Sequence, residues 1–402
     1  MNGFAGKDPA TTQIAHGSGL IQLTNSTLKE MPVQVRRPGY DRSRLTPGIV
    51  HIGLGNFHRA HQAWYVHRLL DEGRCNDWAI IGAGVREADA AQREKLQAQD
   101  YLTTLVELGP SGKSAEIVGS MIDFVEVEAD NAALIRTLGD PAIRIVSLTV
   151  TEGGYYSAPV SGTFDAEHPD VIHDAQFPDR PRTAFGAIIA ALRHRRDTGL
   201  GPLTALSCDN LRGNGAILRQ TVTSLAALTD PNLADWIDKN CSFPNSVVDC
   251  IVPATSPKEI AIAASFGIED NAPVTHEKYR QWVIEDDFCA GRPCWERVGV
   301  VFSGSVHAHE TMKIRILNAG HQIVACPGEL LSVATISDCM SNPLIHAFFR
   351  KVQNTEIAPL VEPVPEVAPH EYVDLVAERF SNPAIVDTTR RVVSDGSSRH
   401  TG

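Results

Sequence analysis

Short apolar runs separated by amphipathic stretches organise the first three quarters of the chain. The runs are rich in β-branched residues and have the length of buried strands. Helical patterns lie between them: residues 60–70 are amphipathic and are followed by Gly73 as a C-cap, and residues 182–199 are a second example. Such an alternation is typical of an α/β domain with a largely parallel sheet. The predicted strands are 47–52, 78–85, 103–108, 143–150 and 203–209.

The pattern changes near residue 300. From there the apolar positions recur at helical spacing, interrupted by the proline-rich stretch 358–371. We therefore predict two domains. Residues 1–300 hold an N-terminal extension and the α/β domain, and residues 301–402 form a mostly α-helical domain. The helices predicted in that second domain are 310–326, 328–341, 343–353 and 370–380.

Composition and charge narrow the range of partners. The formal net charge is −12, so nucleic acid and anionic membranes repel the chain at long range. We expect a small-molecule substrate, no nucleic-acid or membrane partner, and a monomer or small homo-oligomer. No run of about 18 apolar residues suggests a membrane span, and the first 20 residues lack the pattern of a signal peptide. A cytoplasmic protein with eight free cysteines is the expected state.

A glycine loop follows the first predicted strand. Gly53 and Gly55 permit a tight turn and a close approach of the backbone to a pyrophosphate at a helix N-terminus. The third glycine of a GxGxxG motif is absent, and His58 takes its place. An ordinary strand-to-helix turn is the competing interpretation. The strand–helix–strand context favours a Rossmann-type dinucleotide-binding domain, with the cofactor bound by Gly53, Leu54, Gly55, Asn56, Phe57 and His58.

An acid that binds the cofactor ribose is expected after the second strand. Glu87 and Asp89 are both candidates, although each lies farther from the glycine loop than the usual spacing. An acid there repels a 2′-phosphate and favours NAD over NADP, whereas Arg86 beside them would accommodate that phosphate. A solvated loop is the alternative for all three residues.

Four polar residues share one side of a predicted helix in an apolar stretch. At about 100° per residue, Glu310, Lys313, Asn318 and His321 fall within roughly 140° of one another. A buried lysine without a stable counter-charge loses affinity for its proton and can then act as a general base. A solvated polar stripe is the competing interpretation, but the surrounding apolar residues favour a buried site.

Polar residues also follow two apolar stretches of the α/β domain. Asp209 and Asn210 come directly after a predicted strand, and Asn245 and Asp249 flank another short apolar run. Ligands in open α/β sheets bind at the carboxyl ends of strands, which favours Asn210. Its amide N–H groups are suited to stabilising an alkoxide or a polarised carbonyl oxygen.

The metal-binding alternatives are weak. Cys289 and Cys294 are too far apart for a paired CxxC zinc site. His307 and His309 would face the same way on a strand, but no HExxH motif or second ligand cluster accompanies them. We expect no metal ion in the site.

Five ordered motifs resemble one family, the mannitol 2-dehydrogenase or polyol-specific long-chain dehydrogenase family, which also includes fructuronate and tagaturonate reductases. The Lys-x4-Asn-x2-His pattern in the last of them is its specific mark. The motifs are GLGNFHRAHQAWY (53–65), TEGGYY (151–156), SCDNL (207–211), FPNSVVD (243–249) and KIRILNAGH (313–321).

The resemblance implies metal-independent, NAD(P)-dependent oxidation of a secondary alcohol, with Lys313 as the general base. It implies that Asn210 and Asn318 polarise the reacting oxygen and that His321 orients the substrate. Asp89 aligns with the ribose-binding acid of the family, so NAD is expected rather than NADP. Further roles implied are Asp249 as an acid near the substrate, Glu310 on the proton path to the lysine, and Arg391 and Arg399 as substrate-binding groups.

Two departures from the family pattern bear on the function. Cys250 replaces an arginine that commonly follows the aspartate, and Arg399 replaces a lysine. The resemblance also implies a longer helical domain, so we expect a C-terminally short version of the family. The leading prediction is a mannitol-like hexitol dehydrogenase that forms a fructose-like 2-ketose. A hexuronate reductase and a weakly active NAD-binding remnant are the alternatives.

Overall fold

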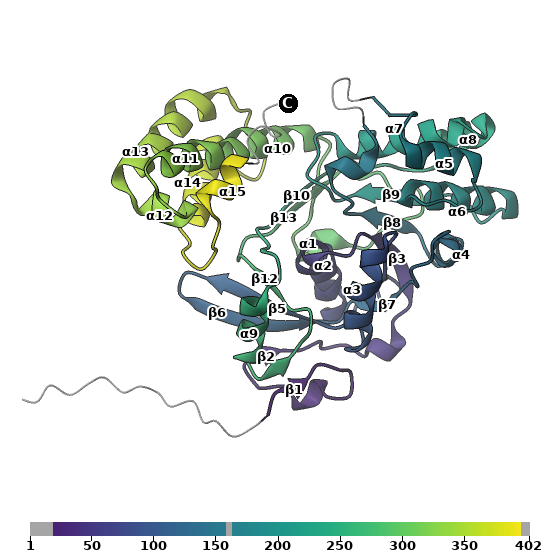
Figure 1. The fold of residues 1–402 in the computed structure, drawn as a ribbon, viewed down its shortest axis with the longest axis horizontal. Helices are drawn as coiled ribbons and strands as arrows, with labels where there is room; N and C mark the ends of the chain where they lie inside the picture. The colour runs from purple at the N-terminus through teal and green to yellow at the C-terminus, as the bar shows by residue number, and fades with distance from the viewer. Residues whose placement is uncertain (1–18, 158–162, 395–402) are drawn as a thin grey trace, which may run out of the picture.

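The computed structural model describes residues 19–157 and 163–394 of the chain. Within these ranges a twisted five-stranded sheet forms the centre of the first domain, and helices cover it (Figure 1). Its order is β7-β4-β3-β8-β9 and every neighbouring pair is parallel. The strands are β3 (Pro47–Ile52), β4 (Ala79–Ala83), β7 (Met121–Phe124), β8 (Ile145–Leu148) and β9 (Thr204–Ser207).

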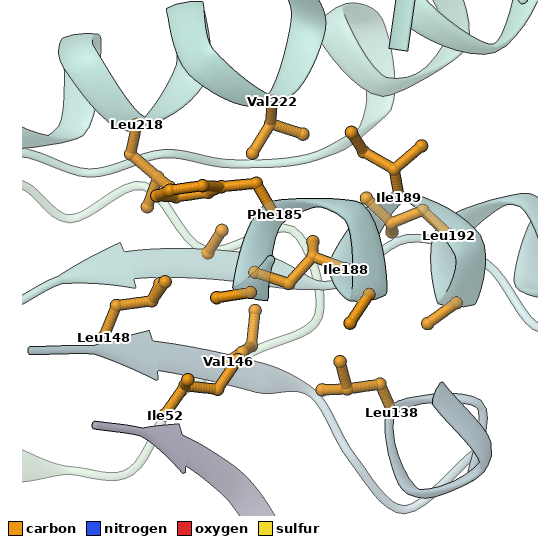
Figure 2. Close-up of a cluster of buried hydrophobic side chains, with 14 of the residues drawn as sticks. Ile52, Leu138, Val146, Leu148, Phe185, Ile188, Ile189, Leu192, Leu218 and Val222 are labelled. Carbon is orange, nitrogen blue, oxygen red and sulfur yellow. The ribbon is translucent and has the colours of Figure 1, made fainter. Parts of the chain in front are cut away.

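The core between this sheet and its helices is mostly aliphatic. Figure 2 shows Ile52, Val146 and Leu148 of the sheet facing Phe185 and Ile188 of helix α6 (Ala184–Thr198). Thr183 caps that helix, because its Oγ1 accepts a hydrogen bond from the Gly186 N–H at 2.9 Å. The helices around the sheet are α1 (Asn56–Ala60), α2 (Gln62–Asp71), α3 (Glu87–Gln97), α4 (Ala132–Leu138), α5 (Pro169–Gln176), α7 (Asn214–Ala227) and α8 (Pro231–Asn240).

Smaller sheets flank the main one. The predicted strand 103–108 is observed as β5 (Thr103–Gly109), but it lies outside the parallel sheet, in a hairpin with β6 (Gly112–Val118). This second sheet has the order β12-β5-β6-β2, with β2 (Val35–Arg36) and β12 (Val274–His276) at its edges. The other strands are β1 (Ile21–Gln22), β10 (Ser246–Asp249), β11 (Ile268–Glu269), β13 (Gln281–Ile284) and β14 (Val301–Phe302), and helix α9 is Pro257–Ala264.

The last part of the chain is helical and packs around its own core (Figure 1). One predicted helix, 310–326, is observed as a longer run in three parts: α10 (Val306–Met312), a π-helical turn (Lys313–Asn318) and α11 (Ala319–Leu330). The others are α12 (Ile336–Ser341), α13 (Pro343–Val352), a second π-helical turn (Gln353–Ile357), α14 (Pro369–Phe380) and α15 (Thr389–Ser394). None of the helices in the described ranges has the length and apolarity needed to span a bilayer. The architecture is a Rossmann-type domain followed by a helical domain, as predicted.

Candidate active site

The glycine loop lies where the order of the parallel sheet reverses. Strands β4 and β8 flank β3, and Gly53 directly follows β3 with φ +89°, a conformation that favours glycine. Its N–H donates to Ala83 O at 3.0 Å, and a Cβ added to it would collide with Thr149 O. Ligands of doubly wound sheets bind at this switch point, beyond the carboxyl ends of the strands.

Gly55 leaves room beside this loop. It is the N-cap of α1, and a Cβ added to it would meet only Gly53 O, at 4.0 Å. The first N–H groups of a helix have no partner inside the helix. The side chain of Asn56 is held in place by its Nδ2, which donates to Pro253 O at 3.0 Å and to Thr255 Oγ1 at 2.8 Å. The open space and the backbone N–H groups fit a dinucleotide pyrophosphate.

The apolar and histidine side chains of the loop point inward. Leu54 belongs to the core, and Phe57 stacks on His61 with 4.9 Å between ring centroids. His58 is 1% exposed and stacks on His51 at 3.4 Å. The buried position of this ring favours a role in shaping the loop, and the predicted contact of His58 with a cofactor stays a prediction.

Acidification from pH 7 to pH 5 is expected to lower the free energy of unfolding, because the buried rings of His51 and His61 resist protonation. Burial lowers the pKa of His51 and of His61 to about 3, against about 6.5 in an unfolded chain. The unfolded chain therefore binds more protons between these values. The stabilisation is complete above about pH 6.5 and is lost as the pH falls, by about 1.4 kcal/mol per pH unit for each histidine.

Urea unfolding at pH 7, 6 and 5 measures this effect. A His51→Gln variant should show a shallower dependence on pH, because one of the buried histidines has gone. Equal unfolding free energies at pH 7 and pH 5 would contradict the expectation that His51 and His61 stay neutral in the folded protein.

Asp89 caps helix α3. Its Oδ2 accepts hydrogen bonds from the N–H groups of Val85 and Arg86, both at 3.0 Å. Glu87 and Arg86 are exposed at the same corner. The carboxylate of Asp89 thus has a structural partner in the loop that follows β4, and its predicted contact with a ribose stays a prediction.

Lys313 is buried and joins the helical run to two strand ends of the first domain. It is 7% exposed, and its Nζ lies 2.6 Å from Asn210 Oδ1 and 2.6 Å from Val248 O. Asn210 follows β9 and Val248 lies in β10. The side chain of Asn210 is exposed. Because its carbonyl oxygen faces Lys313, its amide N–H groups are directed elsewhere.

The π-helical turn changes the spacing of the predicted polar face. A π turn closes its hydrogen bonds over five residues instead of four, and such turns are frequent at functional sites. Lys313 and Asn318, five residues apart, are its first and last residues. An α-helix would place them about 140° apart around the axis, whereas the wider turn brings them closer to one line. His321 follows in α11, and its ring packs on Phe380 at 4.2 Å.

Glu310 lies one turn before Lys313 and is 8% exposed. Its Oε1 accepts from the Gly213 N–H at 2.7 Å, and its Oε2 lies 3.1 Å from His307 Nδ1. His309 instead faces Glu366, with its Nε2 2.8 Å from Oε2. His307 and His309 lie on a helix, not on an extended strand, and they have different acidic partners, which argues against a shared metal ion.

Asp249 ends β10 and forms a buried ion pair that the sequence did not reveal. Both of its oxygens accept from Arg379 of α14, at 2.7 and 3.0 Å. Burial opposes the charge of Asp249, but Arg379 and Lys313 outweigh it and hold the pKa of the carboxyl below its usual value. The neighbouring Cys250 is buried, which raises the pKa of its thiol. The sequence does hold one indication that Arg379 is buried. It lies seven positions after Tyr372 and three after Val376, so it continues their apolar stripe on the predicted helix.

A second residue missed as a contributor is Asp209, beside Asn210. Its carboxylate accepts from the N–H groups of Val150 at 3.1 Å and Thr151 at 2.9 Å, and from the hydroxyl of Tyr155 at 2.7 Å. These bonds tie the end of β9 to the loop after β8. The TEGGYY motif therefore positions the strand end that carries Asn210.

The predicted substrate arginines lie near the end of the chain. Arg391 lies in α15, where its Nη2 is 2.7 Å from Asp387 Oδ2 and its side chain is 57% exposed. Arg399 lies outside the described residues.

A possible metal-ligand group lies away from these residues. Among the described residues, His67, Asp71 and Glu116 have side-chain ligand atoms within 4.8 Å of one another. Arg36 and Arg68 already pair with both carboxylates. An ion-pair network accounts for the group.

Comparison with known proteins places the chain in a family. Family models match along most of its length: the mannitol dehydrogenase Rossmann domain over residues 47–297 and the mannitol dehydrogenase C-terminal domain over residues 305–401. Mannitol 2-dehydrogenase of Cereibacter sphaeroides is 57% identical over 92% of this chain and 77% of its own length. Polyol:NADP oxidoreductase of Gluconobacter oxydans is 42% identical, over 94% and 78%.

The fold agrees with solved structures. Pseudomonas fluorescens mannitol 2-dehydrogenase, in a ternary complex with NAD and D-mannitol, is 42% identical and superposes with a TM-score of 0.89 over 94% of this chain and 77% of that one. A substrate-free D-sorbitol dehydrogenase is 40% identical, also with a TM-score of 0.89, over 94% and 78%. The chain therefore belongs to the mannitol dehydrogenase family.

Proposed function

We propose that this protein is an NAD-dependent, metal-independent polyol 2-dehydrogenase of the cytoplasm. It interconverts a mannitol-like hexitol and a fructose-like 2-ketose, with Lys313 as the general base. The observation that carries the proposal is the buried amine of Lys313 held against Asn210 and Val248 O at the carboxyl ends of β9 and β10. The names of the 57% identical relative and of the complex with NAD and D-mannitol support the substrate class.

The surroundings of Lys313 suit a proton acceptor. A neutral amine keeps two N–H hydrogens, and Asn210 Oδ1 and Val248 O are placed to accept both. The nitrogen lone pair is then the group that takes the proton of the substrate hydroxyl. A bound NAD supplies the hydride acceptor for the carbinol carbon.

The proposed roles of the other polar residues follow from their hydrogen-bonding capacity. Asn210 and Asn318 donate amide N–H groups to the reacting oxygen and stabilise its negative charge. His321 orients the polyol chain from the next turn, and Glu310 and Asp249 set the charge near the base. Arg391 and Arg399 bind the more distant hydroxyl groups. These residues come from two domains, whose boundary along the sequence we place near residue 300.

The proposal assigns NAD rather than NADP to the glycine loop. Asp89 hydrogen-bonds the ribose hydroxyls, and its charge repels a 2′-phosphate. Because one relative is named for NADP, kcat/KM should be measured with both cofactors. A higher value with NADP would overturn this assignment and leave the polyol chemistry standing.

NADH should form when the purified protein is incubated with NAD and mannitol, and EDTA should not reduce the rate. Sorbitol, arabinitol and mannonate complete the substrate panel. Activity confined to mannonate would support the hexuronate reductase alternative, and cofactor binding without turnover would indicate an inactive remnant. Loss of activity on chelation would contradict the lysine mechanism.

A further inference from the structure

Arg379 makes a double fork between two buried acids. Its Nη1 and Nη2 donate to Asp249 at 2.7 and 3.0 Å, and its Nε and Nη2 donate to Glu277 at 3.0 and 2.7 Å. All three side chains are 4–6% exposed. Paired N–H donors in a fixed plane impose one orientation on each carboxylate.

The fork connects the two domains beside the proposed base. Arg379 comes from α14, whereas Asp249 ends β10 and Glu277 directly follows β12. Lys313 hydrogen-bonds the carbonyl of Val248, the residue before Asp249. Fixing the end of β10 from the helical side therefore fixes a partner of the base as well.

The group carries an unbalanced charge. Two carboxylates face one guanidinium, so the trio has a net charge of −1 when both acids are ionised, and the ammonium of Lys313 is a nearby cation among the described residues. Several titratable or charged groups of the described residues lie around the trio and Lys313. They include Tyr279, whose ring lies 4.2 Å from the Arg379 guanidinium, Tyr372, Cys250, His321, His61 and Arg280.

We propose that Arg379 is a positioning residue for the reaction: it holds Asp249 beside Lys313 and sets the negative charge against which Lys313 releases its proton. This inference rests on the proposed function. Neutralising Arg379 leaves more negative charge near Lys313 and favours its ammonium form. Neutralising Glu277 has the opposite effect.

The test measures the titration midpoint of Lys313 directly. Brief acetylation by acetic anhydride at a series of pH values, quantified on the peptide that contains Lys313, reports the fraction of free amine without requiring turnover. Arg379→Met should raise this midpoint and Glu277→Gln should lower it. Each shift should be roughly one pH unit, because each variant removes one charge several ångströms from Lys313. Arg379→Lys, which keeps the charge, should leave the midpoint near that of the unmodified protein.

Arg292 provides a matched control. It also bonds two acids, Asp286 at 2.6 Å and Glu296 at 2.8 Å, and it stacks on Phe302, but its side chain is 19% exposed and its partners are surface groups. Arg292→Met should leave the midpoint unchanged.

Kinetics provide the second readout. For Arg379→Met, kcat for mannitol at pH 7 should fall about tenfold, since one unit in the midpoint is a tenfold change in free amine. It should recover at higher pH, with the KM for NAD unchanged.

If folded Arg379→Met and Glu277→Gln proteins both keep the midpoint of the unmodified protein, Arg379 has only a structural role. If Arg379→Met does not fold, the sign of the Glu277→Gln shift decides. If no polyol is oxidised by the unmodified protein, the proposed function fails, and the midpoints still decide the role of Arg379.

Discussion

Replacement of Lys313 by methionine is expected to lower kcat for mannitol oxidation by about 10²- to 10⁴-fold, the usual contribution of a positioned general base. Methionine has a similar length and no charge. Asn210 Oδ1 and Val248 O each lose a donor at 2.6 Å, so the variant should also be destabilised by about 1–3 kcal/mol. Initial rates of NADH formation and urea unfolding measure the two effects separately.

Arg315→Met is the control for this change. Arg315 lies in the same π-helical turn but is exposed, and its Nη1 donates to Leu360 O at 3.1 Å. Its loss should leave kcat near that of the unmodified protein. A Lys313→Met protein that keeps most of its kcat would show that another group takes the proton.

Gly53→Ala is expected to weaken both the fold and the dinucleotide site. The backbone at φ +89° costs an L-residue about 1–2 kcal/mol, and the collision of the new methyl group with Thr149 O adds about 1–3 kcal/mol of overpacking. Because the strands β3 and β8 must separate to relieve the collision, the loop that approaches the pyrophosphate shifts. NADH affinity, measured by fluorescence titration, should fall at least about tenfold.

Gly73→Ala separates the two contributions. Gly73 also has a positive φ, +70°, but an added Cβ would meet nothing within 4 Å. That variant should be destabilised only by the cost of the backbone conformation, and it should retain its NADH affinity. Equal losses in both variants would show that the contact with Thr149 has no special importance.

Four of the five strands of the parallel sheet were predicted from the sequence, because their side chains are largely buried on both faces. The fifth, β7, was not predicted, since Ile122 is only partly buried and Asp123 is exposed. The apolar run 47–52 coincides with β3, and 203–209 contains β9. The sequence pattern did not separate β5 from that sheet, since an apolar, β-branched run looks the same in a hairpin as in a parallel strand. The distinction lies in pairing with β6, which no local pattern specifies.

The polar face of the predicted helix 310–326 was derived from α-helical spacing, and its lysine, Lys313, is indeed buried. The π-helical turn that alters the relation of Lys313 to Asn318 was not foreseen, because it adds no marker residue such as glycine or proline. The contact with Asn210, 103 positions away, depends on how the two domains pack. Arg379 was missed for the same reason, since its acidic partners belong to the other domain.

The most direct test of the central claim follows the transferred hydrogen. Mannitol deuterated at both C2 and C5, which are equivalent by symmetry, should yield fructose and NADH that carries deuterium on its nicotinamide ring, in the presence of EDTA, with Lys313→Met forming both products far more slowly. NADH without deuterium, or no fructose and no NADH from an intact, NAD-binding protein, would contradict the assignment of a lysine-based polyol 2-dehydrogenase.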